Sequence, residues 1–293
     1  MDASYTLGVG AAVAAGIAFN LGLVLQKAAV MHAGKGTGLM RRLVRSPLWV
    51  TGFTVQFLVG MPLNMLAQAH IGPAMIPGLM SMGLVVLAFG AVRFARESLG
   101  PPDISGMLLV MGAVALFGFS GLGIDVKALD LHKPVFLIRL AVFSAGTAFM
   151  TVACYVLQRG IARWRGVLRI LNAGLLFVQS NLWLGVLMGA LARWSARGFA
   201  GRELLLLGTA SVITFAGSML GITETQRAFQ AGDAAKLVPI QYVPQQIMPV
   251  ISYFAVFGLM PRSRVALFLA VTAAGLILAG SALLARRQAL LAD

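Results

Sequence analysis

Apolar residues fill the chain in long runs, separated by short breaks rich in Lys, Arg, Gly and Pro. A hydrocarbon core roughly 30 Å thick needs about twenty helical residues for one crossing. Because the runs have about that length, the pattern predicts a succession of membrane-spanning helices. The predicted helices cover residues 5–29, 48–69, 73–95, 103–121, 135–157, 167–190, 203–228, 235–259 and 265–285.

Composition agrees with this pattern, since 59% of the residues are hydrophobic and only 11% are charged. We therefore expect an all-α integral membrane protein of about nine transmembrane helices. The net charge of +14 would by itself also suit a nucleic-acid-binding protein, but Lys and Arg lie mainly between and at the ends of the apolar runs. That placement is typical of topology signals, so we expect membrane lipids as partners and no nucleic acid.

The basic residues also predict an orientation. With the N-terminus outside, fifteen Lys and Arg residues fall on the inner side of the membrane and eight on the outer side. Cytoplasmic loops usually carry the excess of basic residues, so this arrangement is preferred over its inverse. We expect a multi-pass protein of the cell membrane, with its N-terminus out and its C-terminus in. The excess of Arg over Lys favours a bacterial inner membrane.

Two weak internal echoes indicate a duplicated architecture. Val24–Lys27 recurs as Val156–Arg159, and the spacing from Gln68 to Pro77 recurs from Gln230 to Pro239 at an offset of 162 residues. Helices two to four would then run antiparallel to helices seven to nine, an inverted repeat of the kind that transporters use. The predicted units are an N-terminal membrane repeat of four helices, residues 1–121, and a C-terminal membrane repeat of five helices, residues 134–285.

Three stretches of the chain resemble a known family. They are Gly60–Pro77, Glu97–Gly112 and Arg227–Val243, and the last keeps a Pro-Ile-x-Tyr-Val spacing. The chain is similar in them to the drug/metabolite transporter (EamA-like) superfamily, and within it to the nine-helix branch of NIPA magnesium transporters. The resemblance implies a helix bundle of that type and makes Mg²⁺ a candidate cargo. Where the family has a glutamate after the first glycine, this chain has Met61.

Glu224 is the one acidic residue that the predicted helices place near the inner third of the membrane. An ionisable group there is a functional-site hypothesis, because an unpaired charge in hydrocarbon is costly. The alternative is that Glu224 pairs with Arg227 or with Lys236 and only shapes the inner mouth. Both interpretations stay open at this point.

Neutral amides give a second candidate site. An unsatisfied Asn or Gln in hydrocarbon is costly, so these side chains should face one another or water. Some would be interhelical hydrogen bonds without further function. Others would line a midplane cavity for a small polar solute. The candidate substrate-binding residues are Asn20, Asn64, Gln68, Glu224, Gln226, Gln230, Gln241, Tyr242 and Gln245.

Prolines predict where the helices bend. Pro73 and Pro77 open the third predicted helix, and Pro239 and Pro244 interrupt the eighth. Each interior proline removes a backbone hydrogen bond and tends to kink its helix. We interpret these four as hinges, with static shape features as the alternative.

The absence of known catalytic motifs narrows the function that we expect. No HExxH, GxSxG or Walker A motif occurs in the sequence, so we expect no enzyme, no cofactor and no resident metal site. The favoured function is a secondary or facilitated transporter of a small polar solute that works by alternating access. Alternatives are a transporter of Mg²⁺ or another divalent cation, as in the NIPA family, and a flippase of a lipid-linked polar headgroup. A homodimer is an open alternative to a monomer.

Overall fold

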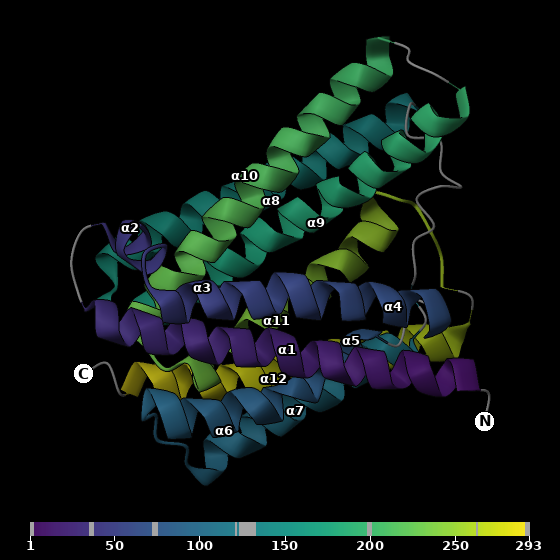
Figure 1. Cartoon of the computed structure of the whole chain (residues 1–293). Coiled ribbons are helices and arrows are strands. Elements are labelled where there is room, and N and C mark those ends of the chain that lie inside the picture. Colours follow the sequence, from purple (N-terminus) through teal and green to yellow (C-terminus); the bar gives the residue numbers. More distant parts are fainter. Residues whose placement is uncertain are drawn as a thin grey trace.

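The computed structural model is a bundle of helices (Figure 1). It describes residues 3–34, 38–71, 76–120, 122, 133–197, 201–261 and 263–290. Within these ranges the regular structure is helical throughout and no strand occurs, which confirms the predicted all-α class. The hinge predicted at Pro73 lies outside the described residues.

Seven helical segments are long and apolar enough to cross a membrane. This finding supports the prediction of a multi-pass membrane protein. They belong to α1 (Ala3–Ala33), the continuous run of α3 (Pro47–Thr54), η1 (Val55–Gly60) and α4 (Met61–Ile71), α7 (Pro101–Phe119), α8 (Pro134–Gly160), α9 (Arg165–Arg197), α10 (Gly201–Ala231) and α12 (Arg264–Leu290).

The remaining helices are shorter or less apolar. The predicted segments 73–95 and 235–259 correspond to α5 (Ile76–Ser81) with α6 (Gly83–Ala95) and to α11 (Ala234–Ala255), none of which is among the seven. Nine crossings therefore remain a prediction. Two short elements, α2 (Leu39–Leu43) and η3 (Ala162–Trp164), lie between longer helices.

Helix α1 packs along both α3–α4 and α6, and α7 packs along α12 (Figure 1). Glycines permit the closest of these approaches. At the break between α5 and α6, the Gly83 backbone lies directly against the Gly16 carbonyl, and Gly16 lies against the Met80 carbonyl. Because no side chain separates them, the interrupted backbone of α5–α6 meets α1 near the middle of its length.

Helices α7 and α12 run antiparallel. Gly106 lies against Gly280 and Leu284, and Asp103, one turn earlier, pairs with Arg287, one turn later. Small residues on both helices let the backbones approach closely, as in many membrane helix pairs.

Two helices depart from regular α geometry for reasons that the sequence supplies. A π turn at Val55–Gly60 precedes Pro62, whose ring would collide with the Leu58 carbonyl in a regular helix. Helix α11 contains Pro239, Pro244 and Pro249, each without a backbone N–H to donate. Interrupted backbone of this kind is tolerated at membrane depth only where protein or a cavity surrounds it.

We predict that Gly83→Ala destabilises the protein by about 1–3 kcal/mol, because an added methyl group would meet the Gly16 carbonyl. The matched control is Gly112→Ala in α7, where nothing lies within 4 Å of the added carbon. The control should keep or slightly raise the unfolding temperature, since Ala favours a helix over Gly by about 0.5–1 kcal/mol. Thermal unfolding of both purified variants in detergent tests this. Equal unfolding temperatures would contradict the backbone contact.

Candidate functional site

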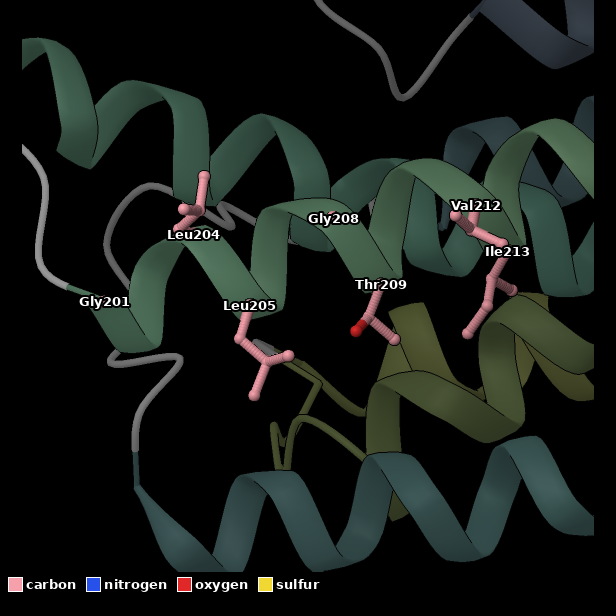
Figure 2. A pocket seen from close by; sticks show the side chains of 7 residues that line it. All are labelled: Gly201, Leu204, Leu205, Gly208, Thr209, Val212 and Ile213. Carbon is pink, nitrogen blue, oxygen red and sulfur yellow. The ribbon is translucent and has the colours of Figure 1, made fainter.

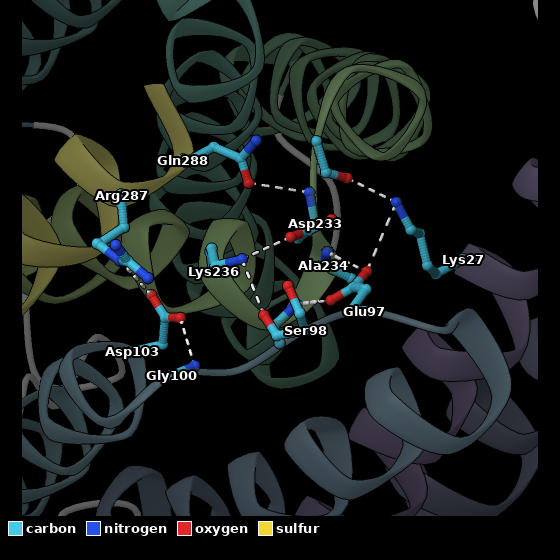
Figure 3. Close-up of polar contacts among 12 residues, drawn as sticks. Lys27, Glu97, Ser98, Gly100, Asp103, Asp233, Ala234, Lys236, Arg287 and Gln288 are labelled. Carbon is cyan, nitrogen blue, oxygen red and sulfur yellow. Dashed lines mark hydrogen bonds and ion pairs between the residues drawn. The ribbon is translucent and has the colours of Figure 1, made fainter. Parts of the chain in front are cut away.

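The corner between α10 and α11 is held by a lysine from α1 (Figure 3). Lys27 donates from Nζ to the carbonyl of Phe229 at 2.8 Å and to that of Gly232 at 2.6 Å. The last carbonyls of a helix have no partner within the helix and carry the negative end of its dipole. Lys27 therefore caps the C-terminal end of α10.

The same corner is held from its other side by a carboxylate. Glu97 accepts hydrogen bonds from the backbone N–H groups of Ala234, at 2.6 Å, and Ala235, at 2.9 Å, which begin α11. Its Oε1 atom lies 3.6 Å from Nζ of Lys27, and the two side chains are only 2% and 7% exposed. A negative group at a helix N-terminus is favourable for the same dipolar reason. One buried ion pair thus caps two helix ends at once.

The backbone explains why Glu97 points inward. Helix α6 ends at Arg96, which adopts the left-handed conformation with a φ of 52°. That conformation is uncommon for a residue with a side chain and reverses the chain direction sharply. Glu97 follows immediately and is buried, whereas Arg96 is exposed.

Further polar contacts join the α6–α7 connection and the end of α12 to this corner (Figure 3). Lys236 donates to the Ser98 carbonyl at 3.1 Å and to the Asp233 carboxylate at 2.6 Å. Gln288 accepts from the backbone N–H of Asp233 at 2.9 Å. We call the set the helix-end clamp, and it consists of Lys27, Glu97, Asp103, Asp233, Lys236, Arg287 and Gln288.

Sequence reasoning missed the clamp. It interpreted Lys and Arg in general as topology signals, named Lys236 only as a possible partner of Glu224, and assigned no site role to Glu97 or Asp233. The three acids and three cations of the clamp balance, which a count of charges per side cannot reveal. The available signal was that charged residues occur inside two of the three stretches that carry the family resemblance, Glu97–Gly112 and Arg227–Val243.

Burial raises the pKa of the Glu97 carboxyl above its ordinary value, although the Lys27 charge and the α11 backbone N–H groups oppose the shift. The carboxyl therefore holds its proton to a higher pH in the folded protein than in the unfolded chain. Protonation of Glu97 would weaken both its attraction to Lys27 and its hydrogen bonds to α11.

A chain of three glutamine amides, the amide chain, lies one helical turn or less from the clamp. Gln26 of α1 donates to Gln56 at 2.6 Å, and Gln226 of α10 donates to Gln26 at 2.6 Å. Gln56 comes from the π turn and donates to the Phe19 carbonyl at 3.0 Å. All three side chains belong to buried residues. The structure therefore brings predicted site residue Gln226 into a polar group that links α1, η1 and α10.

A second polar group lies nearer the middle of α1. Asn20 donates to the Gly16 carbonyl at 2.9 Å, and the Tyr242 side chain of α11 lies beside its amide. Gln241, the residue before Tyr242 in α11, donates from its side-chain amide to the Thr225 hydroxyl at 3.2 Å. Its backbone carbonyl lies against Gly174 of α9. Asn20, Gln241 and Tyr242 are thus gathered between α1, α9, α10 and α11.

Glu224 forms the ion pair that was one of its two sequence interpretations. Its Oε1 atom accepts from Arg227 at 2.8 Å, while Lys236 bonds to Asp233 and Ser98 instead. Glu224 itself is buried, and among the described residues its Oε2 atom has no hydrogen-bond partner. The contact fixes the geometry of Glu224 and leaves its role in transport a prediction.

Asn64 and Gln226 correspond to each other at the predicted repeat offset of 162 residues, but they lie at different levels of the bundle. Ala67, three residues after Asn64, packs against Ala11 and Ala12 near the start of α1, whereas Gln226 contacts Gln26 near its end. Gly60, four residues before Asn64, lies against Phe19, so Asn64 lies at a level of α1 between residues 12 and 19, or about 10–21 Å from the level of Gln26. Asn64 and Gln226 are therefore not neighbours in one small cavity.

The other predicted site residues are placed as follows. Gln230 donates to the Gly34 carbonyl at 2.9 Å, at the clamp end of the bundle. Gln245 is half-buried in α11, and the side chain of Gln68 lies outside the described part of the chain. Pro77 lies in α5, and Pro239 and Pro244 lie inside α11 as expected. Their role as hinges stays a prediction.

Three pockets differ in chemistry. A pocket of 680 Å³ is lined by α10 residues that are mostly apolar, including Leu204, Leu205 and Val212 (Figure 2). A second, of 460 Å³, is lined by apolar residues of α6 and α7. The third, of 350 Å³, lies at the clamp and is lined partly by Lys27, Gln230 and Asp233. The first two suit lipid chains, and the third suits a polar molecule.

We predict that Lys27→Met destabilises the protein by about 3–5 kcal/mol, because it leaves the Glu97 carboxylate buried without its cation. The double variant Lys27→Met/Glu97→Gln should lose less than the sum of the two single variants. A double-mutant cycle from unfolding in detergent measures this coupling. Arg159→Gln is the control, since Arg159 contacts only the exposed Tyr155 ring and hydroxyl in the contacts described. Additive effects would contradict the pairing.

A second prediction concerns pH. Because the folded pKa of Glu97 is raised, its contribution to the unfolding free energy is largest below about pH 4.3, the ordinary value for Glu, and falls as pH rises through the folded pKa. Glu97→Gln cannot titrate. The unfolding free energy of the wild-type protein should therefore fall relative to that of Glu97→Gln as pH increases from about 4 to about 8. Unfolding of both proteins across this range measures the shift. A flat or opposite trend would refute the raised pKa.

In comparisons with protein-family models, curated proteins and solved structures, no significant match to this chain was found. The resemblance to the drug/metabolite transporter superfamily therefore stays a prediction from the residues quoted for it. The candidate site is supported by its own geometry: a buried polar core beside a charged clamp at one end of a membrane helix bundle.

Proposed function

We propose that this protein is a secondary or facilitated transporter that moves a small polar solute across the cell membrane by alternating access. The observation that carries the proposal is the set of buried polar side chains between interrupted helices. Asn20 and Tyr242 lie where α1 meets the broken α5–α6 backbone and the proline-rich α11. Such junctions are where transporters build their binding sites.

The free-energy cost of burying polar groups without partners supports a role for this core beyond packing. Polar groups in a membrane interior are expensive unless they are satisfied, yet several buried amide oxygens here have no partner among the described residues. Packing alone would be served by apolar side chains. A solute that enters this region would replace its hydration shell with these amides.

The helix-end clamp supplies the gate in this proposal. It ties α1, the α6–α7 connection, α11 and α12 together at the end of the bundle that the basic residues assign to the cytoplasm. In this proposal, the clamp holds the cytoplasmic end of the pathway closed. Opening requires the Lys27 and Glu97 caps to leave the α10–α11 corner.

The inverted repeat gains support from packing, with a revised correspondence. Gly16 of α1 lies against the Met80 carbonyl, and Gly174 of α9 lies against the Gln241 carbonyl and Pro244. At the repeat offset of 162, Met80 corresponds to Tyr242, the residue directly after Gln241, so the two contacts match to within one residue. We therefore pair α1 with α9, rather than with the fifth predicted helix, α8. Helix α8 becomes the additional helix, and its largely exposed apolar side chains suit a peripheral position against lipid.

Cargo chemistry favours a polar organic solute over Mg²⁺. Mg²⁺ prefers carboxylate oxygens and releases its waters reluctantly. Among the described residues, no group of three or more His, Cys, Asp or Glu side chains could hold a metal ion. The core offers amides, which suit neutral, zwitterionic or ammonium-bearing molecules.

Uptake into proteoliposomes tests the function. Radiolabelled ethanolamine, serine, glycerol and glucose, and Mg²⁺ read with an internal fluorescent indicator, would be compared between vesicles with the purified protein and empty vesicles. We expect saturable entry of at least one organic probe and Mg²⁺ entry equal to that of empty vesicles. Entry of none of these probes would count against transport of small polar solutes. Saturable entry of Mg²⁺ would instead identify Mg²⁺ as the cargo, as in the NIPA branch.

A cross-link tests the gate. Gly34 and Gln230 join the ends of α1 and α10 through one hydrogen bond of 2.9 Å. In a background in which the single cysteine, Cys154, is replaced by Ser, Gly34→Cys/Gln230→Cys treated with a reducible bifunctional thiol reagent should stop uptake, and reduction should restore it. The control is the same double variant before the reagent is added, because Gln230 also lines the pocket at the clamp. Uptake that continues in the cross-linked protein would show that this end does not open.

A further inference from the structure

The amide chain has a direction that one backbone atom sets. The Phe19 carbonyl can only accept a hydrogen bond, so Gln56 must present its NH2 group to it. The Gln56 oxygen then faces Gln26, which must donate, and the Gln26 oxygen faces Gln226, which must donate in turn. Reversing any one amide would place two donors or two acceptors against each other.

The chain consequently ends on an acceptor. Oε1 of Gln226 is buried and has no partner among the described residues, and the Gln226 side chain belongs to a residue only 1% exposed. Asn20 shows the same arrangement of donor and acceptor. Its NH2 group donates to the Gly16 carbonyl, and its Oδ1 atom has no partner among the described residues. In the part of the chain that is described, the unpartnered buried amide atoms are all oxygens: those of Asn20, Gln158, Asn172, Gln179 and Gln226.

A polar pocket lies about one helical turn beyond Gln226 along α10. Phe229 and Gln230, three and four residues beyond Gln226 on α10, line the 350 Å³ pocket at the clamp, together with Lys27, the neighbour of Gln26. The Asp233 carboxylate also lines it, and the charge of Lys27 is balanced by Glu97. Gln226 is not among the residues that line the pocket and its oxygen is buried, so a solute reaches that oxygen from the pocket only when the clamp opens.

We propose that the Gln226 oxygen, oriented by the Phe19–Gln56–Gln26 chain, binds the solute through an N–H donor, and that the solute class is small primary ammonium compounds. An ammonium group carries three donors and no acceptor, which complements a surface of amide oxygens. A carboxylate carries only acceptors and would meet those oxygens unfavourably. The inference rests on the proposed transport function for its use, but binding can be tested without transport.

The test is ligand-dependent thermal stabilisation of the full-length protein in detergent. The probes are propylammonium chloride, tetramethylammonium chloride and sodium propionate, at equal ionic strength. Propylammonium should raise the unfolding temperature, propionate should not, and tetramethylammonium should act weakly because it has no N–H group. Stabilisation by propionate equal to that by propylammonium would overturn the inference.

Two variants locate the effect. Gln226→Leu should weaken propylammonium binding about tenfold or more, since it removes a hydrogen bond to a charged group. Gln158→Leu is the matched control, because Gln158 is also buried with an unpartnered oxygen but lies at the end of α8. Unchanged binding by Gln226→Leu would place the ligand elsewhere and refute the assignment.

Gln56→Leu guards against a variant that fails to fold and tests positioning. It removes the link to the Phe19 carbonyl, so Gln26 and Gln226 lose their fixed orientation. We expect the preference for propylammonium over propionate to shrink, and a preserved preference would refute the role of the chain. Transport of other solutes with no ammonium binding would overturn this inference and leave the proposed function standing. Ammonium binding without transport of any probe would overturn the proposed function and leave this inference standing.

Discussion

The buried pair of Lys27 and Glu97 is the interaction on which the corner between α10 and α11 depends. Two helices that meet at a corner in a membrane protein leave carbonyls at one end and N–H groups at the other, and hydrocarbon can satisfy neither. Here one cation covers the end of α10 and one anion covers the start of α11, at a separation of 3.6 Å from each other. Each charge is therefore balanced by its partner and by a helix dipole. Because the pair comes from α1 and from the segment after α6, it also fixes how these elements sit against α10 and α11.

The second constraint is the absence of side chains where α1 meets the α5–α6 break. Contact between the backbones of Gly16 and Gly83 brings polar carbonyls to the middle of the bundle without the volume of side chains. Asn20 and Tyr242 occupy the adjoining space. The polar core is thus assembled from interrupted helices whose ends the clamp holds. Backbone packing at the centre and ion pairs at one end together determine its geometry.

Sequence patterning predicted the helices and their approximate bounds because crossing hydrocarbon imposes long apolar runs. It also predicted that Gln226, Gln241, Tyr242 and Asn20 would be interior, since amides avoid lipid. It could not predict the clamp, because Lys27 and Lys236 look like ordinary topology signals until tertiary contacts place acids beside them. It also could not place Asn64 apart from Gln226, since periodicity gives the face of a helix but not its level against another. The π turn at Val55–Gly60 went unpredicted for a related reason: Pro62 signals an irregularity and not its form.

That π turn has a consequence for the geometry of the whole segment from α3 to α4. A π turn accommodates one more residue than an α turn, so every residue after Gly60 is rotated by about 100° relative to its place in a regular helix. The face of α4 that meets α1 is therefore out of phase with the face of α3 that meets it. Deleting one residue within Val55–Gly60 and replacing Pro62 by a residue with a backbone N–H would restore a uniform helix and turn the two halves of this segment relative to each other. The rotation of α4 about its axis is therefore set by the number of residues before Pro62 and by the Pro62 ring, and not by the apolar side chains that α4 packs against α1.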